Sequence, residues 1–406
     1  MKATTSLVIA AVVVGCAAVA HADLDLSYIG AFRALAGTPQ VYGGGLAFYP
    51  LGDGGNGSLF VSDSPVGTGK EIFELNIPSL VISSDVNDLN LAATLQSFDV
   101  GTTPNGMVWR STDGLLYVSS AASGSASVHY RYISTDGTGE STERSGPAWN
   151  EGGNGLTQLP DAWASGFAGG KNLMMVGKRY GPRLAAVDPW NDPVSDLPLL
   201  VYQSGHEVTD YDYNDAHHAV QWVSVGGESN IIISGKDTSA AAATLWFCRT
   251  EDLESPVNLY DPQPYKIESV QSRLFAGQEL FGLAYDADNQ ILYGYEGGWN
   301  KVGVVHAWQV ADDPPTAVAD LAAGAPSDWF MITLSWTAPS DDHPAAGPAA
   351  AYDIRYSESP IDPNNWDAAT QCTGEPTPSA PGQTESFAVT GLSAATTYYF
   401  AVTSAD

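Results

Sequence analysis

A fivefold repetition is the feature that most constrains how this chain can fold. Five short β-rich runs share one pattern, and their first residues lie 56, 58, 58 and 60 positions apart along the sequence. Each run follows a turn rich in Gly, Asp or Asn. The runs are 59–64, 115–120, 173–178, 231–236 and 291–296. A fixed period of this length is typical of an architecture built from one repeated supersecondary unit.

Each unit contains further apolar runs, and these predict four strands joined by tight turns. One run precedes the shared run and a third follows it about 13 residues later. The preceding runs are 45–48, 106–109, 166–167, 220–222 and 282–285. A fourth strand follows in most units, as at 94–100 and 265–270.

The fifth unit has no fourth strand, whereas residues 26–33 form a spare one near the start of the chain. Placing that strand outermost in the last unit closes a ring and removes an exposed sheet edge. Four strands repeated radially describe a β-propeller. The sequence therefore predicts an all-β fold with a β-propeller of five four-stranded blades over 23–311. The units have no signature of a named propeller family, so the number five rests on the periodicity alone.

A second all-β domain follows the composition change at 312–316, which predicts a short stiff linker. Residues 317–406 alternate in polarity with the strand density of a β-sandwich. The chain here reads Leu334-Ser-Trp-Thr-Ala-Pro339, Tyr352-Asp-Ile-Arg-Tyr356 and Gly391-Leu-Ser-Ala-Ala-Thr-Thr-Tyr398.

These motifs resemble a fibronectin type III domain of the kind found in exported bacterial proteins. The resemblance implies an immunoglobulin-like sandwich in which Trp336 and Tyr352 fill the core and Tyr398 forms the tyrosine corner. The sequence stops where that family enters its last loop and strand G, so we expect a domain truncated before strand G. The sequence is then a fragment of a longer one, or a partner donates the missing strand.

The N-terminal residues 1–22 have the pattern of a secretory signal peptide. Lys2 precedes a short apolar run, and Ala20-His-Ala22 is a small-residue cleavage site. We therefore expect a secreted or surface-attached bacterial protein with no transmembrane segment in the mature chain. The alternative is lipoprotein anchoring, because Val13-Val-Gly-Cys16 resembles a bacterial lipobox.

The charge excludes some partners. With 46 acidic against 16 basic residues the net charge is −30. Nucleic acids and anionic membrane surfaces are recognised by clustered Lys and Arg, so we expect neither as a partner of the bulk surface.

Two groups of residues are candidates for ligand binding on the face where loops enter the inner strands. The first enters the fourth blade and comprises Asp210, Asp212, Asp215, His217 and His218. Carboxylates there favour Ca²⁺, imidazoles favour a softer metal, and alternating Asp and Tyr suit a sugar. A solvated loop in an acidic protein is the plainer alternative, and no other cofactor is predicted.

The second group is basic and lies in the predicted loops between second and third strands. These loops contain six of the 15 Lys and Arg residues that follow Lys2. Such a patch would focus an electric field on an anionic glycan or peptide, unless the cations pair with neighbouring acids. The group comprises Lys178, Arg179, Arg183, Lys236 and Lys301, with Lys70, and with Tyr180 and Trp299 as flat contact surfaces.

No catalytic residues are predicted. Asp286 is the sole acid near a predicted inner strand, whereas glycoside hydrolysis needs two carboxylates flanking the bond. We therefore expect a binding or structural role, with a glycan or a surface protein at the loop face. The alternative is an extracellular carbohydrate-active enzyme, a glycoside hydrolase or lyase with an accessory fibronectin type III module.

Overall fold

The computed structural model describes most of the chain. The chain forms two compact units. One spans Leu24–Ala311 and the other includes Asp312–Asp406. Among the residues described, no helix is long and apolar enough to cross a membrane. The described residues are 24–36, 44–63, 70–121, 127–148, 155–177, 183–189, 195–201, 215–225, 228–254, 256, 258–259, 262–275, 279–297, 302–311, 318–324, 330–339, 348–349, 351–362, 365–394 and 396–405.

The first unit is a β-propeller, which confirms the predicted fold class. Its described residues form five four-stranded antiparallel sheets, each of which is one blade. The first blade consists of β2 (Leu46–Tyr49), β3 (Ser58–Asp63), β4 (Glu71–Asn76) and β5 (Thr94–Asp99). The second consists of β6 (Gly106–Arg110), β7 (Leu115–Ala121), β8 (Ser127–Ser134) and β9 (Arg144–Ala148). The third consists of β10 (Leu156–Gln158), β11 (Leu173–Gly177), β12 (Arg183–Asp188) and β13 (Ser195–Val201).

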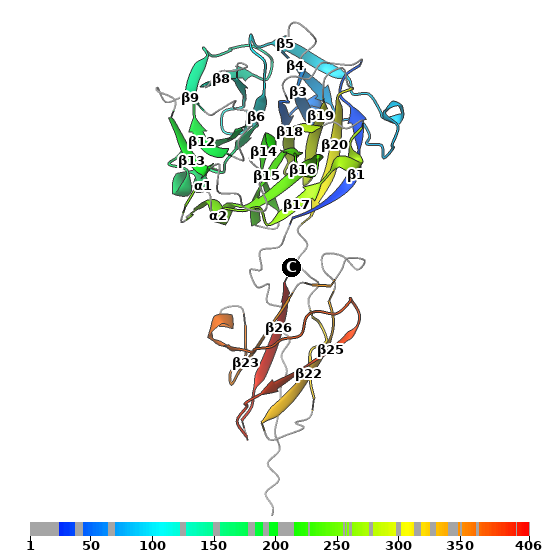
Figure 1. Cartoon of the computed structure of the whole chain (residues 1–406), viewed down its shortest axis with the longest axis vertical. Coiled ribbons are helices and arrows are strands. Elements are labelled where there is room, and N and C mark those ends of the chain that lie inside the picture. The colour runs from blue at the N-terminus through cyan, green and yellow to red at the C-terminus, as the bar shows by residue number, and fades with distance from the viewer. Residues whose placement is uncertain are drawn as a thin grey trace, which may run out of the picture. The chain divides into compact units, whose positions relative to one another are not determined.

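The fourth and fifth blades complete the ring. The fourth consists of β14 (Ala216–Val225), β15 (Glu228–Asp237), β16 (Ala242–Arg249) and β17 (Lys266–Ser269). The fifth consists of β18 (Glu279–Asp286), β19 (Ile291–Gly297), β20 (Val304–Ala311) and β1 (Asp25–Arg33). Figure 1 shows β6, β14 and β18 near the centre of the ring and the outermost strands β5, β9, β13, β17 and β1 around its periphery.

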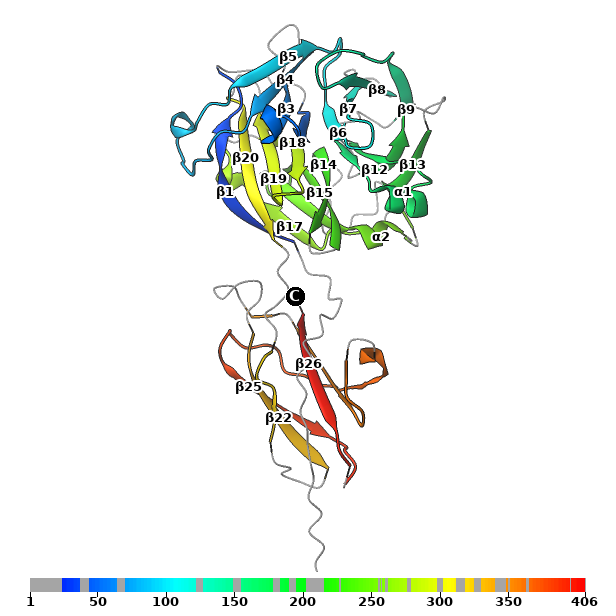
Figure 2. The same ribbon diagram turned by 180° about the vertical axis from the view of Figure 1, so that it is seen from behind.

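The N-terminal strand is the outermost strand of the last blade, as the sequence predicted. Strand β1 pairs antiparallel with β20, from Asp25 opposite Ala311 to Arg33 opposite Val304. Its free edge is partly covered by the segment between β4 and β5. Ala31 exchanges two backbone hydrogen bonds with Val81, each 3.0 Å long. This segment lies against β1 in both views of the ring (Figures 1 and 2), which limits the exposed edge of the closing blade.

The inner strands contact one another in a closed cycle: β2 with β6, β6 with β10, β10 with β14, β14 with β18, and β18 with β2. They approach most closely where the chain enters them, and glycines make this approach sterically allowed. A Cβ on Gly44 would lie 2.1 Å from the Cβ of Phe281, and one on Gly155 would lie 2.4 Å from the Cα of Ala219. Among the described residues, the entry ends of these strands pack tightly, whereas a pocket lies toward their opposite ends.

The third blade departs from the prediction. Its inner strand is β10, whereas Gly166 and Phe167 lie in the helix α1 (Asp161–Phe167). This helix replaces a tight turn between the first two strands of the blade. Trp163 of α1 is buried against Trp222 of the fourth blade, with ring centroids 5.2 Å apart in an edge-on arrangement. Gly166 and Phe167 were therefore wrongly attributed to a strand; they lie at the exposed end of α1, whose buried residues are Trp163 and Ala164.

The described residues contain four further short helices in the loops and one after β16. The latter, α2 (Thr250–Glu254), accepts a hydrogen bond of 3.0 Å from the Trp163 indole through Glu254. The others are η1 (Asp53–Gly55), η2 (Val86–Asp88), η3 (Gln271–Arg273) and, in the second unit, η4 (Trp366–Ala368).

In the second unit, the described residues form two three-stranded antiparallel sheets. One has the order β21 (Ala322–Ala323), β22 (Met331–Thr337), β25 (Thr384–Thr390). The other has the order β24 (Thr370–Gln371), β23 (Ala351–Ser357), β26 (Tyr399–Ala405). Side chains of both sheets form one buried cluster.

The aromatic residues of this unit lie where the resemblance placed them. Trp336 and Tyr352 are buried in the shared core, edge to face with ring centroids 5.1 Å apart. Tyr398 precedes β26, and its hydroxyl accepts a 3.0 Å hydrogen bond from the backbone N–H of Ser393, as in a tyrosine corner. Assignment of this unit to the fibronectin type III family stays a prediction.

Candidate functional site

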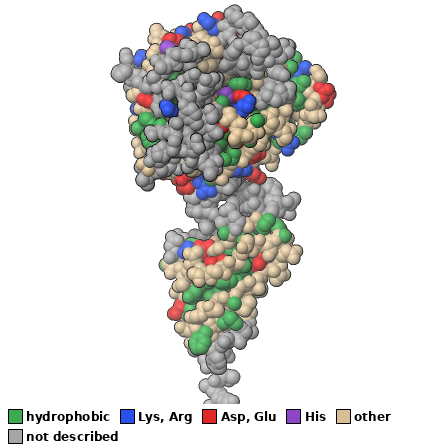
Figure 3. Space-filling model, in the orientation of Figure 1, with side chains coloured by type: hydrophobic (Ala, Val, Ile, Leu, Met, Phe, Trp, Pro, Cys, Tyr) green, Lys and Arg blue, Asp and Glu red, His purple; other side chains and the backbone are tan. Residues whose placement is uncertain are grey.

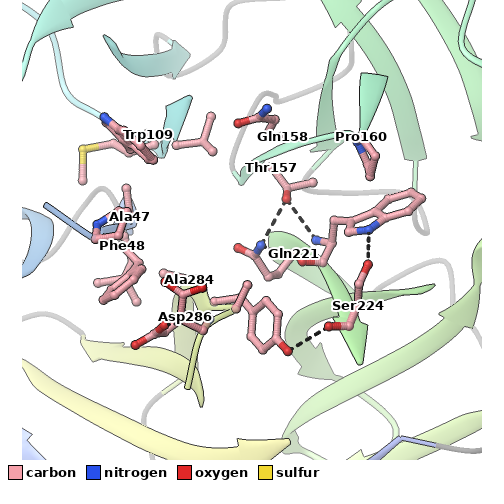
Figure 4. Close-up of a pocket in the computed structure, with 18 residues that line it drawn as sticks. Ala47, Phe48, Trp109, Thr157, Gln158, Pro160, Gln221, Ser224, Ala284 and Asp286 are labelled. Carbon is pink, nitrogen blue, oxygen red and sulfur yellow. Dashed lines mark hydrogen bonds between the residues drawn. The ribbon is translucent and has the colours of Figure 1, made fainter. Parts of the chain in front are cut away.

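A pocket of about 360 Å³ lies at the axis of the propeller, and residues of all five inner strands line it. Turn residues such as Pro50, Pro160, Ala287 and Asp288 also line it. It therefore lies on the face where the first strand of each blade turns into the second. Loops that enter the inner strands emerge on the other face, where the sequence had placed the binding residues. Figure 4 shows the lining side chains Ala47, Trp109, Thr157, Gln158, Gln221, Ser224, Ala284 and Asp286 around one open space.

Aromatic side chains form much of the pocket wall. Phe48, Trp109 and Tyr285 are each partly exposed, whereas Trp222 is buried. Tyr49 packs against Trp109 with ring centroids 5.5 Å apart and restricts its orientation. Burial, and then the neighbouring Asp286 carboxylate, raises the pKa of Tyr285 to about 12. Its phenol therefore stays protonated and donates to the carbonyl oxygen of Ser224 over 3.0 Å.

A hydrogen-bond network fixes the polar side of the pocket. The Thr157 hydroxyl oxygen accepts from the backbone N–H of Trp222 at 2.9 Å and from Nε2 of Gln221 at 3.2 Å. The indole N–H of Trp222 donates to the Ser224 hydroxyl at 2.8 Å. The two bonds to Thr157 connect the inner strands of the third and fourth blades, and the Trp222–Ser224 bond lies within β14, as the dashed lines in Figure 4 show. The site is therefore held in shape without a ligand.

Two carboxylates line the pocket, and both belong to one turn. Asp286 is buried and accepts hydrogen bonds from the backbone N–H groups of Asp288 and Asn289, both 3.2 Å, and from Nδ2 of Asn289 at 2.8 Å. Its carboxylate therefore stabilises the turn between β18 and β19. Asp288 is exposed. Because both acids come from one blade, they do not flank the pocket as a catalytic pair of a glycosidase would.

Sequence reasoning singled out Asp286 as an acid but did not identify the pocket. The residues missed were Trp109, Gln158, Gln221, Tyr285 and Asp288. A usable signal was present, because the last residues of inner strands in a ring of blades must converge on the axis.

Several predicted site residues lie outside the described residues, and their proposed roles stay predictions. These are Asp210, Asp212, Lys178, Arg179, Tyr180, Trp299 and Lys301. Within the described part of the chain, no group of three or more His, Cys, Asp and Glu side chains is arranged to hold a metal ion.

The described residues of the fourth-blade group lie at the entry end of β14. Asp215 is buried and accepts from the backbone N–H and the hydroxyl of Thr238 at 2.9 and 3.2 Å, which fixes the turn between β15 and β16. His217 is fully buried beside Trp246, with ring centroids 4.9 Å apart. Burial, with a smaller effect of His218, lowers the pKa of His217 to about 3, so its ring is neutral at neutral pH.

His218 and Lys236 meet a carboxylate that the sequence had not linked to them. Nε2 of His218 lies 2.7 Å from Oε2 of Glu279, and Nζ of Lys236 lies 3.2 Å from its Oε1. Lys236 is thus paired with an acid. This is what we expected for the alternative in which the basic residues pair with neighbouring acids and form no anion site. Arg183 is half-buried at the start of β12 in another blade. On the face drawn in Figure 3, the Lys and Arg side chains of described residues are scattered among acidic ones.

The Glu279 cluster predicts a pH-dependent contribution to stability. The hydrogen bond from His218, together with the charge of Lys236, lowers the pKa of Glu279 to about 2 against the opposing effect of burial. A depressed folded-state pKa stabilises the fold above the unfolded pKa of about 4.3, and this contribution is lost as pH falls through the folded value. Glu279→Gln should therefore lower the melting temperature at pH 7, and the difference from wild type should shrink between pH 4.5 and pH 3. A difference in melting temperature that stays constant over this pH range would contradict the stabilisation attributed to the ionised Glu279.

Comparison with known proteins adds no function. No family model and no curated protein matches the chain. Among solved structures, the chain is similar to hydrazine synthase of Kuenenia stuttgartiensis, with 13% identity, coverage of 75% of this chain and 78% of that one, and a TM-score of 0.34. It is also similar to a putative glycosidase from Bacteroides thetaiotaomicron, with 14% identity, coverage of 69% of this chain and 87% of that one, and a TM-score of 0.37. A third similar structure is the β-propeller domain of Myceliophteria thermophila Cps50 (Swd1), with 9% identity, coverage of 78% of this chain and 86% of that one, and a TM-score of 0.32. At these identities and TM-scores the similarity says nothing about ligand or reaction.

Proposed function

We propose that this chain is an exported bacterial binding protein whose propeller binds a glycan without converting it. One observation carries the proposal: all five blades contribute to a pre-shaped axial pocket lined by aromatic and uncharged polar side chains. Concave sites with apolar walls and a few fixed polar groups are typical of small-ligand binding. Aromatic rings offer flat apolar surfaces to the C–H faces of a sugar, and amide and hydroxyl groups bond its hydroxyls.

The N-terminal signal pattern and the resemblance of the second unit to fibronectin type III domains support an extracellular role. In this proposal the second unit is a spacer and the propeller is the contact domain. The alternative binding role is that the opposite loop face binds a protein. The basic loop residues are the candidate contacts for that protein.

Catalysis is disfavoured by the carboxylates of the pocket. Asp286 is committed to three hydrogen bonds of its own turn, and Asp288 extends from the same turn. A hydrolase needs an acid and a second carboxylate on either side of the scissile bond. A carbohydrate-active enzyme is therefore the alternative that the experiment has to test.

The test is a screen of the full chain against an array of neutral and acidic glycans, with a parallel assay for new reducing ends or unsaturated products. We expect saturable binding to a subset of glycans and no product from any of them. Heat-unfolded protein is the control for non-specific retention. Release of product from a bound glycan would replace the binding role by an enzymatic one, and binding to no glycan would refute the proposal.

A further inference from the structure

We infer that the axial pocket selects an uncharged sugar at the end of a glycan chain and rejects acidic sugars; the inference rests on the proposed function. The first argument is charge. Among the described residues that line the pocket there is no Lys or Arg, whereas two carboxylates, Asp286 and Asp288, are present. The whole chain carries a net charge of −30. A uronic acid or a sulfated sugar would meet like charge here without a compensating cation.

The second argument is the set of polar atoms left for a ligand. The amide of Gln221 donates to Thr157 and to the carbonyl oxygen of Trp222, at 3.2 and 2.9 Å. Its Oε1 accepts no hydrogen bond from any described residue. Likewise, the Asp288 carboxylate makes no hydrogen bond or ion pair within the described part of the chain. These two groups are acceptors, which the hydroxyl donors of a neutral sugar complement and a ligand carboxylate does not; the indole Nε1 of Trp109, which also has no partner among the described residues, is buried.

The third argument is that the aromatic walls are held in place before a ligand arrives. Trp109 packs on Tyr49, Phe48 stacks on Tyr293 with ring centroids 6.1 Å apart, and the Tyr285 hydroxyl is bonded to the Ser224 carbonyl. Fixed rings lose little conformational freedom on binding, so apolar contact translates into affinity. The apolar C–H faces of a pyranose fit such surfaces.

The fourth argument concerns how a ligand enters. Inner strands surround the pocket on all sides, and their glycine-lined entry ends pack tightly, as at Gly44 and Gly155. A ligand therefore enters along the axis from the turn face. A volume of about 360 Å³ is near the lower end of small-molecule sites, about 300–1,000 Å³. A chain end fits this geometry, whereas a polymer passing across the ring would leave the pocket unfilled.

The test compares matched glycans that differ at their terminal residue. Full-length protein is titrated with labelled oligosaccharides ending in glucose or glucuronic acid, and in galactose or galacturonic acid. A further set carries the neutral sugars only at internal positions. We expect neutral ends to bind at least about tenfold more tightly than their acidic counterparts, and internal positions not to bind.

Charge reversal at the rim tests the cause. Asp288→Lys should reduce the preference for neutral over acidic ends at least about fivefold, because it removes the repulsion and adds a cation at an exposed position. The matched control is Glu358→Lys, which makes the same charge change at an exposed residue of the second unit and should leave the preference unchanged.

The outcomes separate this inference from the proposed function. Equal or tighter binding of acidic ends, binding of internal residues, or an unchanged preference in Asp288→Lys would overturn the inference, although glycan binding would stand. Binding of none of these glycans by the wild type would overturn both.

Discussion

Replacing His306 by alanine should lower the free energy of unfolding of the propeller by about 3–5 kcal/mol, because the change leaves a buried carboxylate without its partner. Nε2 of His306 lies 2.6 Å from Oε2 of Glu296, and both side chains have no exposed surface. The other ring nitrogen, Nδ1, lies 3.1 Å from the hydroxyl of Tyr28. Burial raises the pKa of Tyr28 to about 12, so this phenol stays protonated beside Nδ1.

The three side chains lie on the second, third and outermost strands of the last blade. They connect the strand that the N-terminus contributes to the two strands that the C-terminal part of the propeller contributes. The backbone N–H of Phe275 adds a 2.7 Å hydrogen bond to Oε1 of Glu296. Loss of His306 therefore weakens the blade whose assembly closes the ring.

The matched control is His129→Ala, also in the third strand of a blade. Nδ1 of His129 lies 3.1 Å from Oε1 of Glu143, but these side chains are 25% and 37% exposed. An exposed pair contributes about 0–1 kcal/mol. Urea unfolding of the full chain, followed on the propeller transition, measures both variants. Equal losses would show that burial of the His306 pair contributes nothing.

Most of the propeller could be predicted because its period and its turns are local features of the sequence. The predicted runs 115–120 and 291–296 correspond to β7 and β19, each of which is one residue longer. The spare strand near the N-terminus also follows from this counting, since a ring with a missing edge strand has one place for it. The prediction of the inner strand of the third blade was wrong because α1 lies between the first two strands there, and its apolar residues resemble a short strand in the sequence.

Pairing across blades could not be predicted. Lys236 and Glu279 belong to different blades, and no local pattern indicates that they form an ion pair. The basic loop residues were therefore grouped by sequence position alone. Of the three that the structure describes, Lys70, Arg183 and Lys236, the last is paired with an acid. Likewise, Asp215 was a candidate ligand but holds a turn, because its partner Thr238 lies on the far side of a hairpin.

The axial pocket depends on convergence of five segments that are each about 58 residues apart. Trp109, Gln158, Gln221 and Tyr285 are unremarkable in their own strands. They come together because each lies near the end of an inner strand and the five inner strands form a closed ring. Sequence reasoning assigned the binding role to the other face by analogy with propellers in general.

Filling the pocket tests the central claim most directly. Ala287 is exposed, lines the pocket and lies in the turn between β18 and β19. Ala287→Trp adds bulk at the mouth without removing any core side chain. We expect it to weaken binding of the tightest glycan from the array at least about thirtyfold, or about 2 kcal/mol, with an unchanged melting temperature.

The control substitution is Ala240→Trp, at an exposed position of the turn between β15 and β16 on the opposite face. Isothermal titration calorimetry of wild type and both variants, with the same glycan, is the deciding measurement. The account predicts that binding is lost in Ala287→Trp and retained in Ala240→Trp. Wild-type affinity in Ala287→Trp would contradict it, because a ligand that tolerates a filled pocket does not bind there.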